Sequence, residues 1–113
     1  MPPLEIADRL LNIGVHLALI TMAEDGCLAV SKDMVIRVFA PQVKAIDGCG
    51  AGATFSAGYI YGYLLGWELE QSVRFATAAA SLKVTRPGLK MFPIKNIIEF
   101  AENLTVQRTS RIE

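Results

Sequence analysis

The sequence has few residues of the kinds that build metal sites or disulfide frameworks. Among its 113 residues it contains two cysteines, Cys27 and Cys49, and one histidine. A small secreted fold held by disulfides needs a denser set of cysteines, and a structural zinc site needs four closely spaced ligands. Both classes are therefore excluded, and we expect the two cysteines to be reduced thiols.

An excess of charge of either sign is also lacking. Eleven lysines and arginines balance eleven aspartates and glutamates, and charged residues make up only 19% of the chain. This balance provides no basic surface for nucleic acid. Hydrophobic residues make up 52%, which excludes intrinsic disorder. Because an apolar chain without net charge tends to associate, we expect a homo-oligomer or another protein partner.

A run of twenty residues without charge, 48–67, is long enough to cross a bilayer. Its first five residues are rich in glycine and favour a loop, which leaves about thirteen residues, a length typical of a buried helix. Gly58, Gly62 and Gly66 then permit close packing of this helix against another. The N-terminus shows no basic stretch followed by an apolar one. We therefore expect a cytoplasmic protein without a membrane span.

Hydrophobic periodicity in the first part of the chain predicts a helix followed by strands. The pattern over 4–13 is that of a short amphipathic helix that ends before Gly14. The continuous apolar run 15–22 predicts a strand buried on both faces. Two runs within 27–39 predict a hairpin that turns at Lys32-Asp33, and the alternation over 43–47 predicts another short strand.

The second part of the chain is predominantly helical by the same criteria. Helices are predicted at about 52–65, 69–83 and 93–104, and the polar tail 105–113 is expected to be frayed. We therefore predict one α/β domain over 1–104, with three or four strands including a hairpin, packed by three or four helices. The strand at 15–22 needs neighbours on both sides, which three following helices cannot supply, so the sheet resembles one end of a larger sheet.

A glycine-rich loop joins the predicted strand at 43–47 to the helix that follows. Gly50 and Gly52 allow the backbone to approach a ligand closely and to adopt positive φ. The start of a helix presents unpaired amides and the positive end of its dipole, which suit a phosphate. The spacing matches neither the Walker loop nor the dinucleotide fingerprint. From these residues alone, tight packing and phosphate binding both remain open.

Three segments together resemble the ribokinase/PfkB family of carbohydrate kinases. Residues 47–58, DGCGAGATFSAG, are similar to the family signature Asp-Thr-x-Gly-Ala-Gly-Asp followed by a small residue, Phe, any residue, Ala and Gly. Residues 74–88 resemble its nucleotide-side helix and the loop after it, and residues 21–26 resemble its Thr-x-Gly-x-x-Gly turn. The resemblance covers about 4–104 and implies a ribokinase-like C-terminal fragment. The N-terminal part and the lid, which hold the sugar, have no counterpart.

The resemblance implies ATP-dependent phosphoryl transfer to a sugar hydroxyl, with ATP or ADP and Mg²⁺ as cofactors. It places the phosphate contacts in the glycine loop, at Gly50, Ala51, Gly52 and Ala53. It places the nucleotide contacts on the turn and on the nucleotide-side helix, at Thr21, Gly26 and Thr77. For Thr77, simple packing within a buried helix is an equally open interpretation.

The chain departs from the family pattern at the residue that removes the proton from the attacking hydroxyl. The family has Asp at this position and the chain has Ala53, whose methyl group accepts no proton. Loss of a positioned general base costs on the order of 10²–10⁴ in rate. We therefore assign no catalytic residue and expect a pseudoenzyme-like chain that is inactive alone. Gly48 replaces a Thr of the signature, and Ala23 replaces a Gly of the turn, where it would obstruct a positive φ.

The resemblance also implies a monovalent-cation site, such as one for K⁺, beside the glycine loop. Asp47 matches the aspartate that shapes this site, and the remaining ligands would be carbonyls near Lys83, Arg86 and Gly88. The hydroxyl that often completes such a site is not evident at Met91-Phe92. The sequence therefore does not predict a complete cation site.

Two functional hypotheses follow from the sequence. The first is a nucleotide-binding part of a carbohydrate kinase, impaired in catalysis by Ala53. The second is a non-catalytic assembly module that dimerises or pairs with a chain resembling the missing N-terminal part, because the apolar content is high and the sheet is incomplete.

Overall fold

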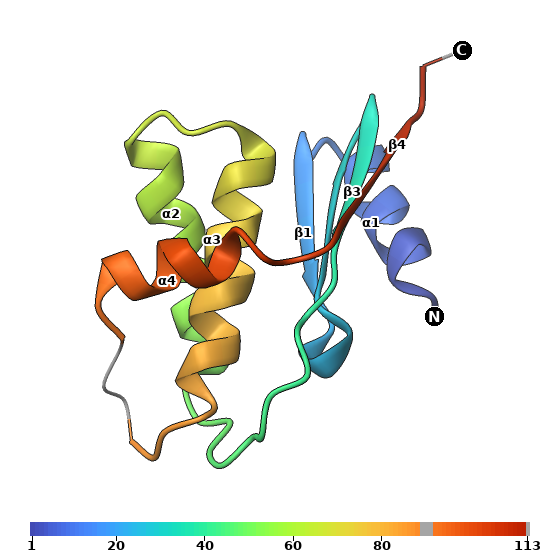
Figure 1. Cartoon of the computed structure of the whole chain (residues 1–113). Coiled ribbons are helices and arrows are strands. Elements are labelled where there is room, and N and C mark those ends of the chain that lie inside the picture. The colour runs from blue at the N-terminus through green and yellow to red at the C-terminus, as the bar shows by residue number, and fades with distance from the viewer. Residues whose placement is uncertain (89–91, 113) are drawn as a thin grey trace.

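The computed structural model describes residues 1–88 and 92–112, which form two layers of helices around one sheet (Figure 1). The sheet has four antiparallel strands in the order β1-β2-β3-β4. Helix α1 covers one face, and α2, α3 and α4 lie on the other. The elements are α1 Pro3–Asn12, β1 Leu17–Thr21, the 3₁₀ turn η1 Ala23–Asp25, β2 Cys27–Ser31, β3 Met34–Val38, α2 Ala51–Leu64, α3 Leu69–Lys83, α4 Ile94–Ala101 and β4 Val106–Ser110. The predicted α/β class is confirmed.

The hairpin predicted over 27–39 is present as β2 and β3. The hydroxyl oxygen of Ser31 accepts hydrogen bonds from the amides of Asp33 and Met34, at 3.4 and 3.2 Å. This serine therefore satisfies two backbone donors of the turn that no strand partner could reach, which is the usual role of such side chains in turns. The helices predicted at 52–65 and 69–83 are present within one residue of their expected ends.

The strand predicted over 43–47 is wrong, because these residues form an extended loop instead. The amides of Ile46 and Asp47 both donate to the carbonyl oxygen of Val84, at 2.7 and 3.0 Å. The loop thus takes its backbone hydrogen bonds from the end of α3 rather than from a neighbouring strand. Alternation alone cannot distinguish these two ways of satisfying an extended backbone.

The prediction of a frayed tail at 105–113 is also wrong, because Val106–Ser110 forms β4 and pairs antiparallel with β3. Arg108 forms an ion pair with Glu70 on α3 at 2.6 Å, and Arg111 pairs with Asp8 on α1 at 2.8 Å. Strand β4 lies at the edge of the sheet and is largely exposed, so it needs few apolar residues. A polar sequence is therefore compatible with an edge strand and does not by itself indicate disorder.

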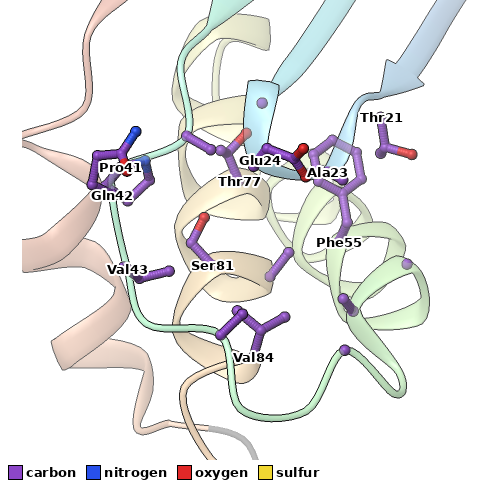
Figure 2. A pocket seen from close by; sticks show the side chains of 17 residues that line it. Thr21, Ala23, Glu24, Pro41, Gln42, Val43, Phe55, Thr77, Ser81 and Val84 are labelled. Carbon is purple, nitrogen blue, oxygen red and sulfur yellow. The ribbon is translucent and has the colours of Figure 1, made fainter.

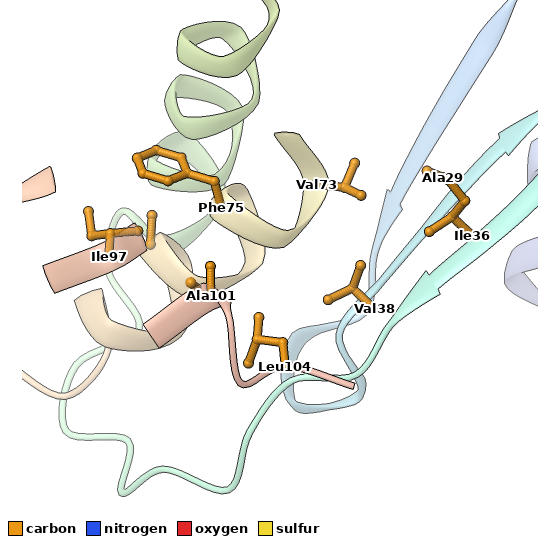
Figure 3. Close-up of a cluster of buried hydrophobic side chains, with 10 residues drawn as sticks. Ala29, Ile36, Val38, Val73, Phe75, Ile97, Ala101 and Leu104 are labelled. Carbon is orange, nitrogen blue, oxygen red and sulfur yellow. The ribbon is translucent and has the colours of Figure 1, made fainter. Parts of the chain in front are cut away.

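The main core lies between the sheet and the two helices α3 and α4 (Figure 3). Phe75 on α3 and Ile97 on α4 pack toward one another, and Val38 and Leu104 close the end nearest the loop before β4. A second cluster joins Ala7 of α1 to Ala18 and Val30 on the opposite face. Strand β1 therefore has apolar contacts on both faces, as predicted, although Ala18 is its only fully buried residue.

Helices α2 and α3 approach each other closely at Gly58 and Gly62, as predicted, but the prediction is wrong for Gly66, which lies after the end of α2 with φ +78 and whose Cβ would meet no atom within 4 Å. A Cβ placed on Gly58 would lie 3.0 Å from Cα of Ala76, and one on Gly62 would lie 2.5 Å from Oγ of Ser72. The two helices thus pack with their backbones in near contact, which positions the start of α2 beside the end of α3. Across the described residues, the helices are too short or too polar to traverse a bilayer.

Candidate functional site

A pocket of about 460 Å³ lies at the end of the sheet where the glycine loop begins α2 (Figure 2). Four segments line it: the turn 21–26, the loop 40–48, the first turns of α2, and the last turns of α3. Its volume falls within the range of small-molecule and cofactor sites. The pocket brings together Thr21, Gly26 and Thr77 with Ala51 and Gly52, so residues of both predicted contact sets share one cavity.

The glycine loop leaves two backbone amides free at the start of α2. Gly50 has φ +81 and precedes the helix, and the amide of Thr54 donates to its carbonyl oxygen at 2.9 Å. Ala51 donates to the carbonyl oxygen of Gly48 at 3.3 Å. Within the described part of the chain, the amides of Gly52 and Ala53 have no acceptor, and no side chain caps the helix. Free amides at a helix start are the groups that bind phosphate oxygens.

The structure bears on one of the two interpretations that the sequence left open for this loop, namely tight packing at Gly52. A Cβ on Gly52 would meet no atom within 4 Å, and the residue is exposed and lines the pocket. Packing therefore does not require glycine at this position, and phosphate binding there stays a prediction. Gly50 is different, because its positive φ is a backbone requirement that glycine meets without strain.

Asp47 holds the glycine loop against the loop that follows α3. Its two carboxylate oxygens accept hydrogen bonds from the amide of Cys49 at 2.9 Å and from the amide of Gly88 at 3.0 Å. The Cys49 amide, then the Gly88 amide and the nearby Lys83 ammonium, lower the pKa of Asp47 below its usual value. The carboxylate is therefore ionised at neutral pH and connects two segments 41 residues apart in the chain.

Of the residues predicted for a cation site, Gly88 donates its amide to Asp47, and Lys83 is near enough to lower the pKa of that carboxyl. The carbonyl oxygen of Lys83 accepts the amide of Arg86 at 3.3 Å. The Arg86 guanidinium lies over the ring of Phe92, 3.7 Å from its centroid. Met91, where the sequence offered no hydroxyl, lies outside the described residues. The described residues form a hydrogen-bonded junction here, and the cation site stays a prediction.

Lys83 itself is the largest fully buried side chain, with only 1% of its surface exposed. It ends α3 beside the start of α2, and its Nζ has no hydrogen-bond partner among the described residues. A buried ammonium without a hydrogen bond is costly. Its nearest identified electrostatic partner is Asp47, whose pKa it lowers. The sequence predicted a role only for the backbone carbonyl of Lys83, and the burial of its side chain was not predicted.

The predicted nucleotide residues on the turn and on α3 have structural roles of their own. The Thr77 hydroxyl donates to the carbonyl oxygen of Val73 at 2.8 Å, so its hydrogen is used within the helix and only the rest of the side chain faces the pocket. Gly26 has φ +93, and a Cβ there would overlap the carbonyl oxygen of Val38. Ala23 adopts φ +50, the positive value that the sequence analysis expected alanine to obstruct.

Glu24 is the one charged side chain that lines the pocket, within the part of the chain that the structure describes. Figure 2 draws it at the upper end of the view, with Val84 at the lower end. The sequence analysis did not select it, although it lies inside the turn 21–26 that was selected. No lysine or arginine among the described residues lines the pocket, so an anion there would depend on the backbone amides.

Comparison with known proteins gives this geometry a family context. Residues 4–95 match the family described as pfkB family carbohydrate kinase. A sugar kinase of Archaeoglobus fulgidus is 29% identical over 84 residues, which cover 74% of this chain and 34% of the relative. The chain spans about one third of the length of the curated relatives that it matches.

Solved structures of the same fold support this result. The ribokinase of Thermotoga maritima superposes with a TM-score of 0.81 at 29% identity, over 88% of this chain and 34% of its own. The ribokinase of Arabidopsis thaliana, solved with ribose and ATP, superposes with a TM-score of 0.79 at 26% identity, over 87% and 33%. The family match covers most of the sequence, and these structures place the fold among ribokinase-like proteins. The chain therefore belongs to the pfkB family of carbohydrate kinases.

Proposed function

We propose that this chain is the nucleotide-phosphate-binding part of an ATP-dependent carbohydrate kinase, and that phosphoryl transfer is impaired at the position of Ala53. The observation that carries the proposal is the pair of free amides of Gly52, which lines the pocket, and of the next residue, Ala53, which does not line it. These amides and the positive end of the α2 dipole stabilise phosphate charge without a basic side chain.

The pocket fits the rest of a nucleotide by its shape and polarity. Most of the side chains that line it are apolar, including Val43, Phe55 and Val84, and such walls suit a flat base. ATP would bring Mg²⁺ with its phosphates, and the metal would neutralise charge that this chain leaves without a side-chain cation. Both Asp47 oxygens accept a backbone amide, so K⁺ at this carboxylate would share an oxygen with one of these hydrogen bonds.

Phosphoryl transfer depends mainly on positioning and electrostatics, so the free amides would still stabilise the transferred group. The side chain of Ala53 cannot accept the proton of the attacking hydroxyl, so this step of the reaction lacks its general base. Ala53 is exposed at the third position of α2, where a side chain would point into solvent near the free amides. A carboxylate there would also interact favourably with the helix dipole.

The two cysteines provide a direct test of nucleotide binding. Cys49 is exposed within the glycine loop, whereas Cys27 is buried, and burial raises its pKa to about 12. Alkylation at neutral pH should therefore modify Cys49 alone. We expect ATP or ADP with Mg²⁺ to slow this modification and to give a saturable heat of binding in calorimetry. Absence of both effects at millimolar nucleotide would contradict the proposal.

The catalytic part of the proposal is tested by restoring the carboxylate. Ala53→Asp, assayed together with the N-terminal part of a related kinase, should increase ATP-dependent sugar phosphorylation by about 10²-fold or more. Ala53→Asn is the matched control, since it has a similar shape but accepts no proton at neutral pH. Equal activity of the two variants would show that the missing base is not what limits the reaction.

A further inference from the structure

A second cavity, of about 620 Å³, lies at the end of the sheet opposite the glycine-loop pocket. It is bounded by the end of α1, residues 14–16, Lys32 of the hairpin turn and Arg111 after β4. Strand β1 begins directly after residues 14–16 and ends at Thr21, which lines the first pocket, so the strand runs from one cavity to the other. The volume lies within the range of small-molecule sites. We call this second space the α1–hairpin cavity.

The described residues that line this cavity include three with basic side chains and one with a carboxylate. Lys32, Arg111 and His16 are the basic residues, and Asp8 is the acidic one. The Arg111 guanidinium donates two hydrogen bonds to the Asp8 carboxylate, at 2.8 and 3.1 Å, so these two charges offset one another. Lys32 is exposed, and its ammonium forms no ion pair with any carboxylate that the structure describes. The cavity therefore keeps one positive charge without a partner.

Arg111 is held in a fixed position beside the cavity. Its amide donates to the carbonyl oxygen of Asp33 at 2.9 Å, and its guanidinium donates to the carbonyl oxygen of Ser31 at 3.4 Å as well as to Asp8. These contacts use three of the five N–H donors of the guanidinium. The other two, on Nε and Nη2, have no acceptor among the described residues. Donors on a guanidinium that is already ordered suit the oxygens of a carboxylate or phosphate, because little side-chain freedom is lost on binding.

We propose that the α1–hairpin cavity binds a small organic anion through a phosphate or carboxylate group, held between the Lys32 ammonium and the free donors of Arg111. Leu11 and Val15 line the same cavity and offer apolar contacts to a carbon skeleton, and the His16 ring can hydrogen-bond a further polar group. The inference does not depend on nucleotide binding, because the residues that carry it lie outside the glycine-loop pocket.

The first test measures binding of four probes to the full chain by calorimetry and thermal melts, at constant ionic strength. Ribose 5-phosphate carries a phosphate group, citrate carries carboxylates, inorganic phosphate lacks a carbon skeleton, and ribose lacks the charge. We expect saturable binding of ribose 5-phosphate, citrate or both, weaker binding of inorganic phosphate and none of ribose. A bound anion would connect α1, the hairpin turn and the segment after β4, so Tm should rise by about 10 °C when the probe is in about 100-fold excess over its Kd.

The second test removes the unpaired charge. Lys32→Met should weaken binding by about 10-fold or more, which is the loss expected for one hydrogen bond to a charged group. The matched control is Lys95→Met, which makes the same change of net charge at an exposed lysine of α4 that does not line the cavity. This control should leave the affinity unchanged. Because both lysines are exposed, both variants should keep the Tm of the unchanged chain without a probe.

The results that would overturn the proposal differ from those that would overturn the proposed function. Binding that slows alkylation of Cys49 and is not weakened by Lys32→Met would place the probe at the glycine loop instead. Absence of saturable binding by both organic probes at millimolar concentration, or equal weakening by Lys32→Met and Lys95→Met, would also overturn the proposal. Protection of Cys49 by ATP is measured separately, so either binding site can fail without the other.

Discussion

Substitution of Gly52 by alanine should change stability and binding in opposite directions. The methyl group would meet no atom within 4 Å, and Gly52 lies in the first turn of α2, where its backbone is helical. Alanine is favoured over glycine in a helix by up to about 1 kcal/mol, and it also restricts the unfolded chain. We therefore expect Gly52→Ala to raise the free energy of unfolding by about 0.5–1 kcal/mol, which corresponds to about 2–5 °C in Tm for a domain of this size.

The same methyl group would occupy the space from which a phosphate reaches the free amides of residues 52 and 53. A hydrogen bond to a charged group contributes about 1.5–3 kcal/mol, so losing one should weaken ATP binding by about 10-fold to 150-fold. Thermal melts give the first quantity and calorimetry gives the second. Unchanged affinity in a stabilised variant would refute the assignment of these amides to phosphate. The control is Gly62→Ala, whose Cβ would lie 2.8 Å from Cε3 of Trp67 and should lower stability by about 1–3 kcal/mol.

Three further substitutions test the surroundings of the site. Ala23→Gly should raise the free energy of unfolding by about 0.5–1 kcal/mol, because alanine at φ +50 is strained; a lower Tm would contradict this. Lys83→Met should raise the free energy of unfolding by about 1–3 kcal/mol, since it removes a buried ammonium without a hydrogen bond among the described residues. A lower free energy of unfolding in denaturant titration would show that the ammonium has a stabilising partner. Asp47 has a lowered pKa when folded, so the unfolded chain binds the proton first, and the contribution of this carboxylate is complete at neutral pH and lost below about pH 4. Asp47→Asn should therefore lower Tm at pH 7 and make Tm fall less steeply between about pH 4 and pH 2. If Tm of the variant falls as steeply as that of the unchanged chain, the hydrogen bonds of Asp47 to the amides of Cys49 and Gly88 do not contribute to stability.

The elements with strong local signals could be predicted from the sequence. Gly14 and the 3.6-residue periodicity defined α1, the two apolar runs on either side of Lys32-Asp33 defined the hairpin, and Gly58 and Gly62 indicated the close contact of α2 with α3. These features are local, or they follow from one residue type at one spacing. The class of fold followed from them.

The two segments that were predicted wrongly, 43–47 and 105–113, depend on contacts with residues distant in sequence. Residues 43–47 alternate like a strand, but their amides find the carbonyl oxygen of Val84, which no local pattern reveals. Strand β4 is polar because it is an edge, and its pairing with β3 becomes visible only in three dimensions. A strand and an extended loop have similar backbone conformations, so pattern alone cannot separate them.

The candidate site could be located from sequence but not resolved in detail. The motif identified the loop and the missing carboxylate at Ala53, and the structure then showed which amides are free. The roles of Thr77 and Gly26 were ambiguous because each also satisfies its own helix or turn. Glu24 and the side chain of Lys83 escaped notice because nothing in their neighbourhood along the chain signals where their charges lie.

The ion pair between Arg111 and Asp8 links residues 103 positions apart, so it connects the segment after β4 to α1. The guanidinium also donates to the carbonyl oxygen of Ser31 in the central hairpin. Loss of the final few residues would therefore remove a contact of α1, an element at the other end of the chain.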